Sequence, residues 1–457
     1  MKPVDRLARY VTDTSFNDIP EKVIKRAKFL IMDSIGCALG ATKTDLGKTY
    51  LRLGKRLGGE PESRLAGDKE KVSVENAALV NTQLANLLDF DDMYDNYPPF
   101  HPGCGIIQTA LAAGEKNSAT GKQFLTAVVV GYEVCLRVGR AMGHAMWTGG
   151  TPNLAAPIGP ATVAAKLLDL KGGGVKRTLE IVEVAGGSLT TGTPKRRKYD
   201  IELDRTGSVK SNFGIAAHQG ITSAEQAALG LDGGKGLLGS NLKEWYLAGL
   251  NSENYDQLDK DLGGSYRILD VKFKPTPSCH LTHLPITAAW KALEGETIEE
   301  DEVEELVVKG VKRLAHFSWS NMLEAQLSIP CTLALAVKGV PPDEWYRNER
   351  FLETDIKQLA DKVRFVNDPE IEEAEIEDGK MSCEVEIVLN DGKTRSARVD
   401  QDHLKGAKKN PMSEDGLREK FSKNAVGSIS GTVNQLERSL MGIESADNIR
   451  ELTELLG

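Results

Sequence analysis

The chain has 457 residues, 40% hydrophobic and 27% charged, which is the composition of a soluble globular protein with about two or three domains. Its net charge of -9 argues against a general nucleic-acid surface. The charged N-terminal stretch contains no apolar run typical of a signal peptide, and we expect no membrane association. Six scattered cysteines without a CxxC pair fit a reducing compartment, so we expect a cytoplasmic protein.

The first part of the chain is predicted to be helical. Apolar residues recur at three- and four-residue spacing in segments rich in alanine and glycine. We predict helices over residues 20–39, 74–88, 103–115, 121–142, 161–170 and 215–229.

The pattern changes after about residue 267. Strand-like composition occurs at 268–273, 304–313 and 383–399, and Asn390-Asp391-Gly392 predicts a hairpin turn in the last of these. Helical segments at 284–294, 330–338 and 354–362 lie between them, and helical sequence returns at 417–421 and 432–441. We therefore predict a mainly α fold. A large all-helical domain takes residues 1–267 with about 405–457, and a smaller α+β lid domain takes 268–404.

A crowded group of carboxylates marks the candidate site. Asp89, Asp91 and Asp92 stand within four positions, and His101 follows after one loop. Like charges held this close raise one another's pKa unless a partner, a metal or a substrate compensates them. This cluster is therefore where we expect chemistry.

Three basic residues stand just before predicted helix starts. His101 precedes Pro102, Lys210 precedes the 215–229 helix, and His280 precedes Thr282, a plausible N-cap. Helix starts present free N–H groups and a partial positive charge, so these positions favour a polycarboxylate ligand. Taken singly, each is equally well explained as a surface residue near a loop.

Rival sites are weaker. The aspartates with His101 could hold a divalent cation, but they could equally be solvated or capping. Cys279, His280 and His283 have zinc-ligand chemistry without a second pair at zinc spacing. Gly234 to Gly239 fits GxGxxG but follows helical sequence, which favours a turn over a dinucleotide site. We expect no metal.

Several blocks, taken together and in order, resemble the MmgE/PrpD family, which includes 2-methylcitrate dehydratase, cis-aconitate decarboxylase and iminodisuccinate epimerase. The resemblance covers nearly the whole chain. Its blocks are Met32 to Ala38, Asn76 to Asp92, His101-Pro102-Gly103, Gly131 to Val134, Val163 to Leu168, Lys274 to His283 and Ala325 to Cys331.

The resemblance implies a homodimer, chemistry without a cofactor and a small anionic carboxylate substrate. It also implies that the pocket is lined by the catalytic candidates Asp89, His101, Lys210, Lys274 and His280. We expect the neighbouring residues Asp92, Met93, Thr151 and His283 to contact the substrate.

The chain departs from the family pattern at three places. A histidine common ahead of the alanine-rich helix is absent near Gly150, another is absent after Lys210, and Met93 stands where a hydroxyl residue is common. These losses change which protons can be moved.

We expect a lyase that removes a proton α to a carboxylate of a small di- or tricarboxylic acid, such as 2-methylcitrate or a relative, with dehydration as the leading reaction. Epimerisation or isomerisation, decarboxylation, and a binding homologue without turnover remain alternatives.

Overall fold

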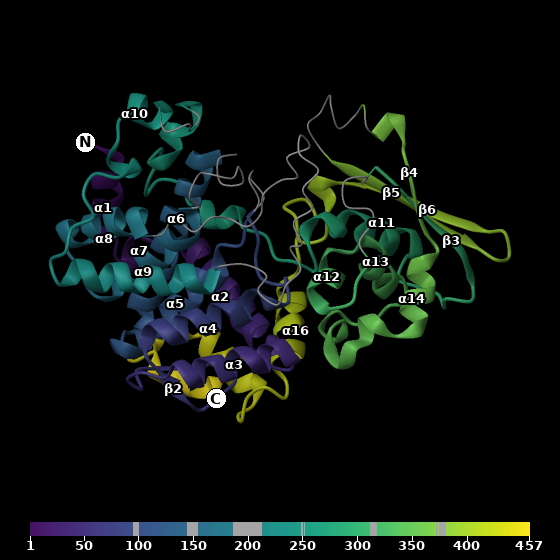
Figure 1. The fold of residues 1–457 in the computed structure, drawn as a ribbon, viewed down its shortest axis with the longest axis horizontal. Helices are drawn as coiled ribbons and strands as arrows, with labels where there is room; N and C mark the ends of the chain where they lie inside the picture. Colours follow the sequence, from purple (N-terminus) through teal and green to yellow (C-terminus); the bar gives the residue numbers. More distant parts are fainter. Residues whose placement is uncertain are drawn as a thin grey trace.

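The structure is a computed structural model that describes residues 1–94, 100–143, 154–185, 213–247, 250, 252–310, 318–371, 373 and 381–457. A helical region, formed by residues 1–270 and the C-terminal tail, lies beside a sheet region formed by residues 283–400 (Figure 1). Among the described residues no helix is long and apolar enough to cross a membrane.

The helical region is built mainly from α-helices. Its α-helices are α1 (Pro3–Asp13), α2 (Glu21–Ala41), α3 (Asp45–Leu57), α4 (Val74–Leu87), α5 (Gly103–Lys116), α6 (Gly121–Met142), α7 (Ala155–Leu167), α8 (Gly172–Ala185), α9 (Phe213–Ala228) and α10 (Leu242–Leu247). A two-stranded antiparallel ladder pairs β1 (Ser63–Arg64) with β2 (Lys71–Val72). The predicted helices in this part are confirmed, although α7 begins earlier than expected.

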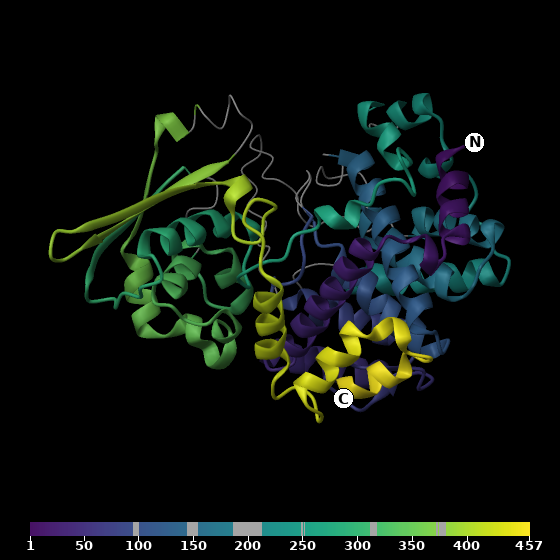
Figure 2. The same ribbon diagram turned by 180° about the vertical axis from the view of Figure 1, so that it is seen from behind.

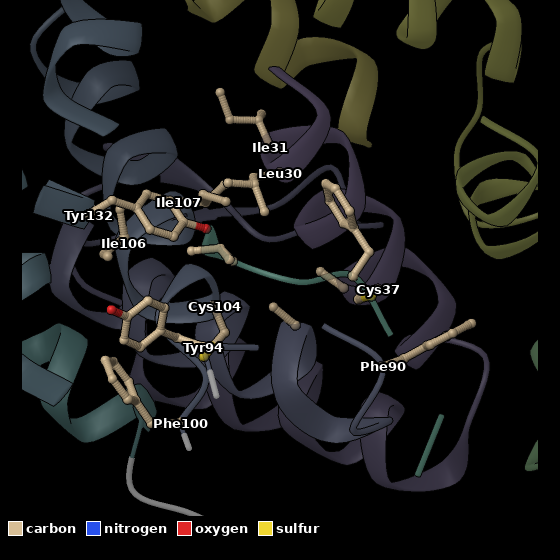
Figure 3. Close-up of a cluster of buried hydrophobic side chains, with 14 of the residues drawn as sticks. Leu30, Ile31, Cys37, Phe90, Tyr94, Phe100, Cys104, Ile106, Ile107 and Tyr132 are labelled. Carbon is tan, nitrogen blue, oxygen red and sulfur yellow. The ribbon is translucent and has the colours of Figure 1, made fainter. Parts of the chain in front are cut away.

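These helices pack closely around α2, α5 and α6. Leu30 and Ile31 of α2 share one core with Ile106 of α5 and Tyr132 of α6 (Figure 3). At Gly131 an added Cβ would lie 2.5 Å from Val163 Cγ2, so only glycine lets α6 and α7 approach this far. The abundance of alanine and glycine in the sequence thus serves helix packing.

The sheet region holds a four-stranded sheet in the order β4-β3-β5-β6. Its strands are β3 (Val303–Lys309), β4 (Val363–Val366), β5 (Ser382–Leu389) and β6 (Thr394–Asp400). β3 pairs with β4 in parallel and with β5 antiparallel, and β5 and β6 form the predicted hairpin. Gly392 has a φ of +83° in the turn, which explains the Asn-Asp-Gly sequence there.

Helices cover this sheet. α11 (His283–Leu293) packs against β5 and β6, and α13 (Ile329–Val337) packs on α11. α12 (Met322–Leu327) precedes α13, and α14 (Thr354–Asp361) leads into β4. The predicted helices at 284–294, 330–338 and 354–362 are therefore confirmed.

The predicted strand at 268–273 is wrong. Residues Arg267–Asp270 form the short 3-10 helix η5, and the Ile268 N–H bonds Glu133 Oε1 of α6 at 3.0 Å. Only Lys272 makes a β-bridge, with Met93. A buried carboxylate takes the amide that a strand would have paired, and composition alone does not reveal this.

The C-terminal tail returns to the helical region. α16 (Glu414–Ala425), α17 (Val433–Met441) and α18 (Arg450–Thr453) form it, and α16 packs on α2 (Figure 2). An added Cβ at Gly36 would lie 3.0 Å from the Phe421 ring, which shows how closely α2 and α16 approach. α16 stands at the junction with the sheet region (Figure 1).

Further 3-10 helices connect these elements: η1 (Phe16–Asp18), η3 (Leu237–Gly239), η4 (Ser252–Leu258), η6 (His280–Thr282), η8 (Pro342–Glu344), η9 (Arg347–Leu352), η10 (Gln401–His403), η11 (Ile443–Ser445) and η12 (Glu454–Leu456). The segment Gly234 to Gly239 is a turn leading into η3 and follows a helix, so it is not the strand-to-helix loop of a dinucleotide site.

Candidate active site

Asp89 occupies an unusual backbone position just beyond the end of α4. Its φ is +53°, in the left-handed region that non-glycine residues adopt rarely, and its N–H bonds the Asn86 carbonyl at 3.0 Å. Such conformations cost free energy and cluster at functional sites. The turn directs the Asp89 carboxylate away from its neighbours on α4 and toward the segment before α11.

Lys274 meets Asp89 from that segment. Its Nζ lies 2.6 Å from Asp89 Oδ1, and the two residues are 2% and 3% exposed. A pair this far from water is stable only when its geometry is good, because both charges have lost their hydration. The contact joins positions 185 residues apart.

His101 completes the group. Its Nε2 lies 3.3 Å from Asp89 Oδ1 and its Nδ1 lies 3.3 Å from Asp91 Oδ1. The Phe213 ring at the start of α9 lies edge-on to the imidazole, with ring centroids 6.2 Å apart. The His101 side chain keeps 19% of its surface exposed, more than either Asp89 or Lys274, so the imidazole is the most accessible side chain of the three.

Asp91 is held from the opposite side. The Asn86 amide nitrogen lies 3.1 and 3.3 Å from its two carboxylate oxygens, and Asp91 is fully buried. Asn86 comes from the last turn of α4, so the helix that ends just before Asp89 also fixes Asp91. His101 therefore lies between two buried carboxylates, each of which has a further partner.

Asp92 has two partners inside the protein. Its Oδ1 accepts the Gly103 N–H at 3.0 Å, and its Oδ2 accepts the Tyr132 hydroxyl at 2.8 Å. Burial, followed by the charge of Asp91, raises the pKa of Asp92 well above its usual value. A Cβ at Gly103 would lie 2.3 Å from Asp92 Oδ1. Asp92 thus supports the start of α5, and its contact with substrate stays a prediction.

Met93 ties this turn to the segment that carries Lys274. Its N–H donates to the Lys272 carbonyl at 2.9 Å, and the Lys272 N–H donates back at 2.7 Å. Its side chain is only 3% exposed. The pairing sets the register between the two segments and so brings Lys274, two residues onward, to Asp89.

His283 is also a buried support. Its Nε2 lies 3.2 Å from the Ser278 carbonyl oxygen and 3.3 Å from Thr276 Oγ1. Burial, then the charges of Lys274 and His280, lowers the pKa of His283 well below its usual value. The ring is therefore neutral and holds the loop before α11, and its contact with substrate stays a prediction.

His280 begins η6 and is half-buried. Its ring centroid lies 6.1 Å from that of His283, which places it near the Lys274 group. Thr282 stands at the N-cap position of α11 but does not cap it, because its hydroxyl donates to Ser278 Oγ at 2.8 Å. The predicted helix start is present, whereas its predicted cap is not.

Gln326 of α12 joins both sides of the site, and sequence reasoning did not single it out. Its amide donates to the Leu87 carbonyl at 2.9 Å, and its main-chain carbonyl accepts the Cys279 N–H at 2.9 Å. It lies in the block Ala325 to Cys331 that resembles the family, which was the only signal for it.

The cluster could supply metal ligands, but it already contains its own cation. Asp89, Asp91 and His101 each offer one ligand atom, all within 4.8 Å of one another. The Lys274 ammonium bonds Asp89 Oδ1 at 2.6 Å and neutralises the carboxylate that a metal would need. Within the described part of the chain, Cys279, His280 and His283 do not form such a group.

Two predicted site residues, Lys210 and Thr151, lie outside the described residues. A cleft of about 390 Å³ lies where the helical and sheet regions meet, lined by residues 43–46, 48, 320–323 and others from 346–351. None of the predicted site residues that the structure describes lines this cleft.

Comparison with known proteins identifies the family of the chain. The model of the MmgE/PrpD N-terminal domain matches residues 5–253, and that of the C-terminal domain matches residues 276–441. Human cis-aconitate decarboxylase is 26% identical, with 96% of this chain and 91% of the relative aligned. The mouse enzyme is 25% identical over 96% and 90%, and the Aspergillus terreus enzyme is 24% identical over 98% and 95%. The chain belongs to the MmgE/PrpD family.

Proposed function

We propose that this protein is a lyase that acts on a small di- or tricarboxylic acid at the Asp89, His101 and Lys274 group. The observation that carries the proposal is the shared Asp89 oxygen, which lies 2.6 Å from Lys274 Nζ and 3.3 Å from His101 Nε2. Similarity to cis-aconitate decarboxylases supports it and moves decarboxylation ahead of dehydration as the leading reaction.

His101 is the proposed proton carrier. It is the most exposed of the three, and its two ring nitrogens face two carboxylates that orient the imidazole. A ligand can touch it without first breaking the buried Asp89–Lys274 pair. His280, at the start of η6, is the proposed second acid or base, and Lys210 is the proposed further cation.

The leading reaction needs few groups. When a carboxylate leaves as carbon dioxide, its bonding electrons stay on the adjacent carbon and spread into a neighbouring carboxyl group. Cations near that carboxyl stabilise the charge, each typically contributing a few kcal/mol, and an imidazolium then protonates the carbon. Dehydration uses the same charge but requires a base for the α-proton and an acid for the departing hydroxyl.

We also propose that the sheet region acts as a lid. In this proposal residues 1–267 and about 405–457 form one domain, residues 268–404 form the other, and two chains form a homodimer. The support is that Lys274 and His280 belong to the connection between the regions, whereas Asp89 and His101 belong to the helical region. A substrate bound between this connection and the helical region would contact residues of both.

An assay with a panel of acids tests the function. Cis-aconitate, citrate and 2-methylcitrate are incubated with the protein in deuterated water and followed by proton NMR and carbon dioxide release. We expect carbon dioxide from at least one unsaturated tricarboxylate, with one deuterium incorporated per product molecule, either at the carbon that lost the carboxylate or at the far end of the double bond. A new conjugated acid without carbon dioxide indicates dehydration, and α-proton exchange alone indicates epimerisation.

A binding homologue would show only thermal stabilisation by these acids. If His101→Ala and Asp89→Asn both kept the full turnover of the wild type on a confirmed substrate, the proposed site would be wrong. His403→Ala is a matched control, because this histidine also lies beside an aspartate, Asp400, but on the exposed surface.

A further inference from the structure

Lys420 of α16 is a buried cation beneath the candidate site, and the proposed reaction does not use it directly. Its side chain is 5% exposed, and its Nζ lies 2.6 Å from Asp33 Oδ1 on α2. The same Nζ donates to the Phe90 carbonyl at 2.6 Å and to the Lys274 carbonyl at 3.1 Å. It also lies 3.9 Å from the centre of the Phe90 ring.

The two carbonyls belong to the two segments that make the site. Phe90 directly follows Asp89, and the second carbonyl is that of Lys274 itself. The side chains of Asp89 and Lys274, carried by the same two backbone segments, meet at 2.6 Å. The Lys420 ammonium therefore bonds the backbone of both segments, at Lys274 itself and at Phe90, the residue next to Asp89.

Neutralising Asp33 would need only one of these bonds. An ammonium has three N–H donors, and in Lys420 they go to one carboxylate and two carbonyls. Burial alone would lower the pKa of Lys420, but Asp33 and other nearby groups raise it above its usual value, so the group stays charged. A charged donor forms stronger hydrogen bonds to carbonyls than a neutral one.

We infer that Lys420 is a positioning residue that fixes Asp89 against Lys274, and through Asp89 sets the place of His101. The inference rests on the proposed function of that group. α16 reaches the site from the C-terminal tail, so the tail contributes to the geometry of the site as well as to the packing of α2.

The test separates positioning from stability. Lys420→Met leaves Asp33 buried without its cation and lowers stability. Asp33→Asn with Lys420→Met removes both charges, and we expect it to recover much of the thermal midpoint. We expect kcat of this double variant to remain lower than that of the wild type by on the order of 10²-fold, because small displacements of catalytic groups cost this much. KM should change far less.

Lys28 provides a matched control. It is also buried, and its Nζ joins α2 to the tail through Glu444 Oε1 at 2.6 Å and the Met441 carbonyl at 2.7 Å. Lys28→Met should lower the thermal midpoint and leave kcat of the folded protein unchanged. The inference is overturned if the double variant regains wild-type kcat together with its stability, or if Lys28→Met lowers kcat as much.

Two further variants distinguish this inference from the proposed function. If Asp89→Asn and Lys274→Met keep wild-type turnover, the proposed site fails and the positioning role fails with it. If those variants lose turnover while the Asp33→Asn/Lys420→Met protein keeps it, the positioning role alone fails.

Discussion

The turn formed by residues 88–94 and 100–103 and the segment from Lys274 to His283 contribute opposite halves of the candidate site. The turn carries buried carboxylates and one imidazole, whereas the segment carries a buried ammonium and two histidines. Without Lys274, Asp89 would lose the buried ammonium bonded to its Oδ1, and without Asp89, Lys274 would lose that carboxylate. Reactive geometry therefore exists only where the two segments meet.

The same turn also shows how differently two nearby carboxylates are used. Asp89 faces a cation and an imidazole, whereas Asp92 faces a backbone N–H and a tyrosine hydroxyl. A buried carboxylate with neutral donors supports the fold, and one with a cation and an exposed imidazole can take part in chemistry. Variants that break the contact between the two segments, or that separate the roles of Asp89 and Asp92, test this comparison.

Lys274→Met breaks the contact and has the largest expected effect. It leaves Asp89 buried without a cation, which should lower the free energy of unfolding by about 3–5 kcal/mol and also reduce turnover. Chemical denaturation measures the first effect and the panel assay the second. Asp89→Asn/Lys274→Met is the control, because it buries no unpaired charge and should be more stable than Lys274→Met. If Lys274→Met were as stable as the wild type, this result would contradict the pairing of Asp89 with Lys274.

His101→Gln leaves the contact intact and removes the proposed proton carrier. We expect kcat to fall on the order of 10²–10⁴-fold, the usual contribution of general acid–base catalysis. The free energy of unfolding should change much less than in Lys274→Met, since the side chain is partly exposed. Unchanged kcat in this variant would assign the proton transfer to another group.

Tyr132→Phe tests the supporting role of Asp92. It removes a hydroxyl donor from a buried carboxylate, which should cost about 1–3 kcal/mol of stability. Turnover by the folded protein should stay at the wild-type level. A large loss of kcat at unchanged stability would instead indicate that Asp92 contacts the substrate.

His283 predicts a pH dependence of stability. Its pKa is lowered on folding, so the unfolded chain binds a proton more readily, and stability is lost as pH falls below about 6.5. The slope from one such group is at most about 1.4 kcal/mol per pH unit. We expect the free energy of unfolding to fall less between pH 7 and pH 5 in His283→Gln than in the wild type. Equal losses would mean that His283 is not held neutral.

Helix patterns predicted most of the helical region, because apolar periodicity and glycine content report packing faces directly. The Asn-Asp-Gly hairpin was equally readable, since its turn demands a positive φ at Gly392. The prediction of a strand at 268–273 was wrong because the Glu133 carboxylate accepts a hydrogen bond from the Ile268 N–H. This contact joins residues 135 positions apart.

The candidate site was predicted in part. The carboxylate cluster and the helix-start argument indicated Asp89, His101 and His280, and the family resemblance added Lys274. Nothing in the local sequence of Lys420 or Asp33 indicates that their side chains meet beneath the site, because that contact depends on how α16 packs on α2. The supporting roles of Asp92 and His283 depend on burial, which the motif does not encode.

A double-mutant cycle on kcat/KM tests most directly whether the two segments form one catalytic unit. Wild type, Asp89→Asn, Lys274→Met and the double variant are compared on the best substrate from the panel. Residues that act as a unit are strongly non-additive, so we predict that the double variant is about as active as the poorer single variant. Losses that multiply would show that Asp89 and Lys274 act independently, and would contradict this account of the site.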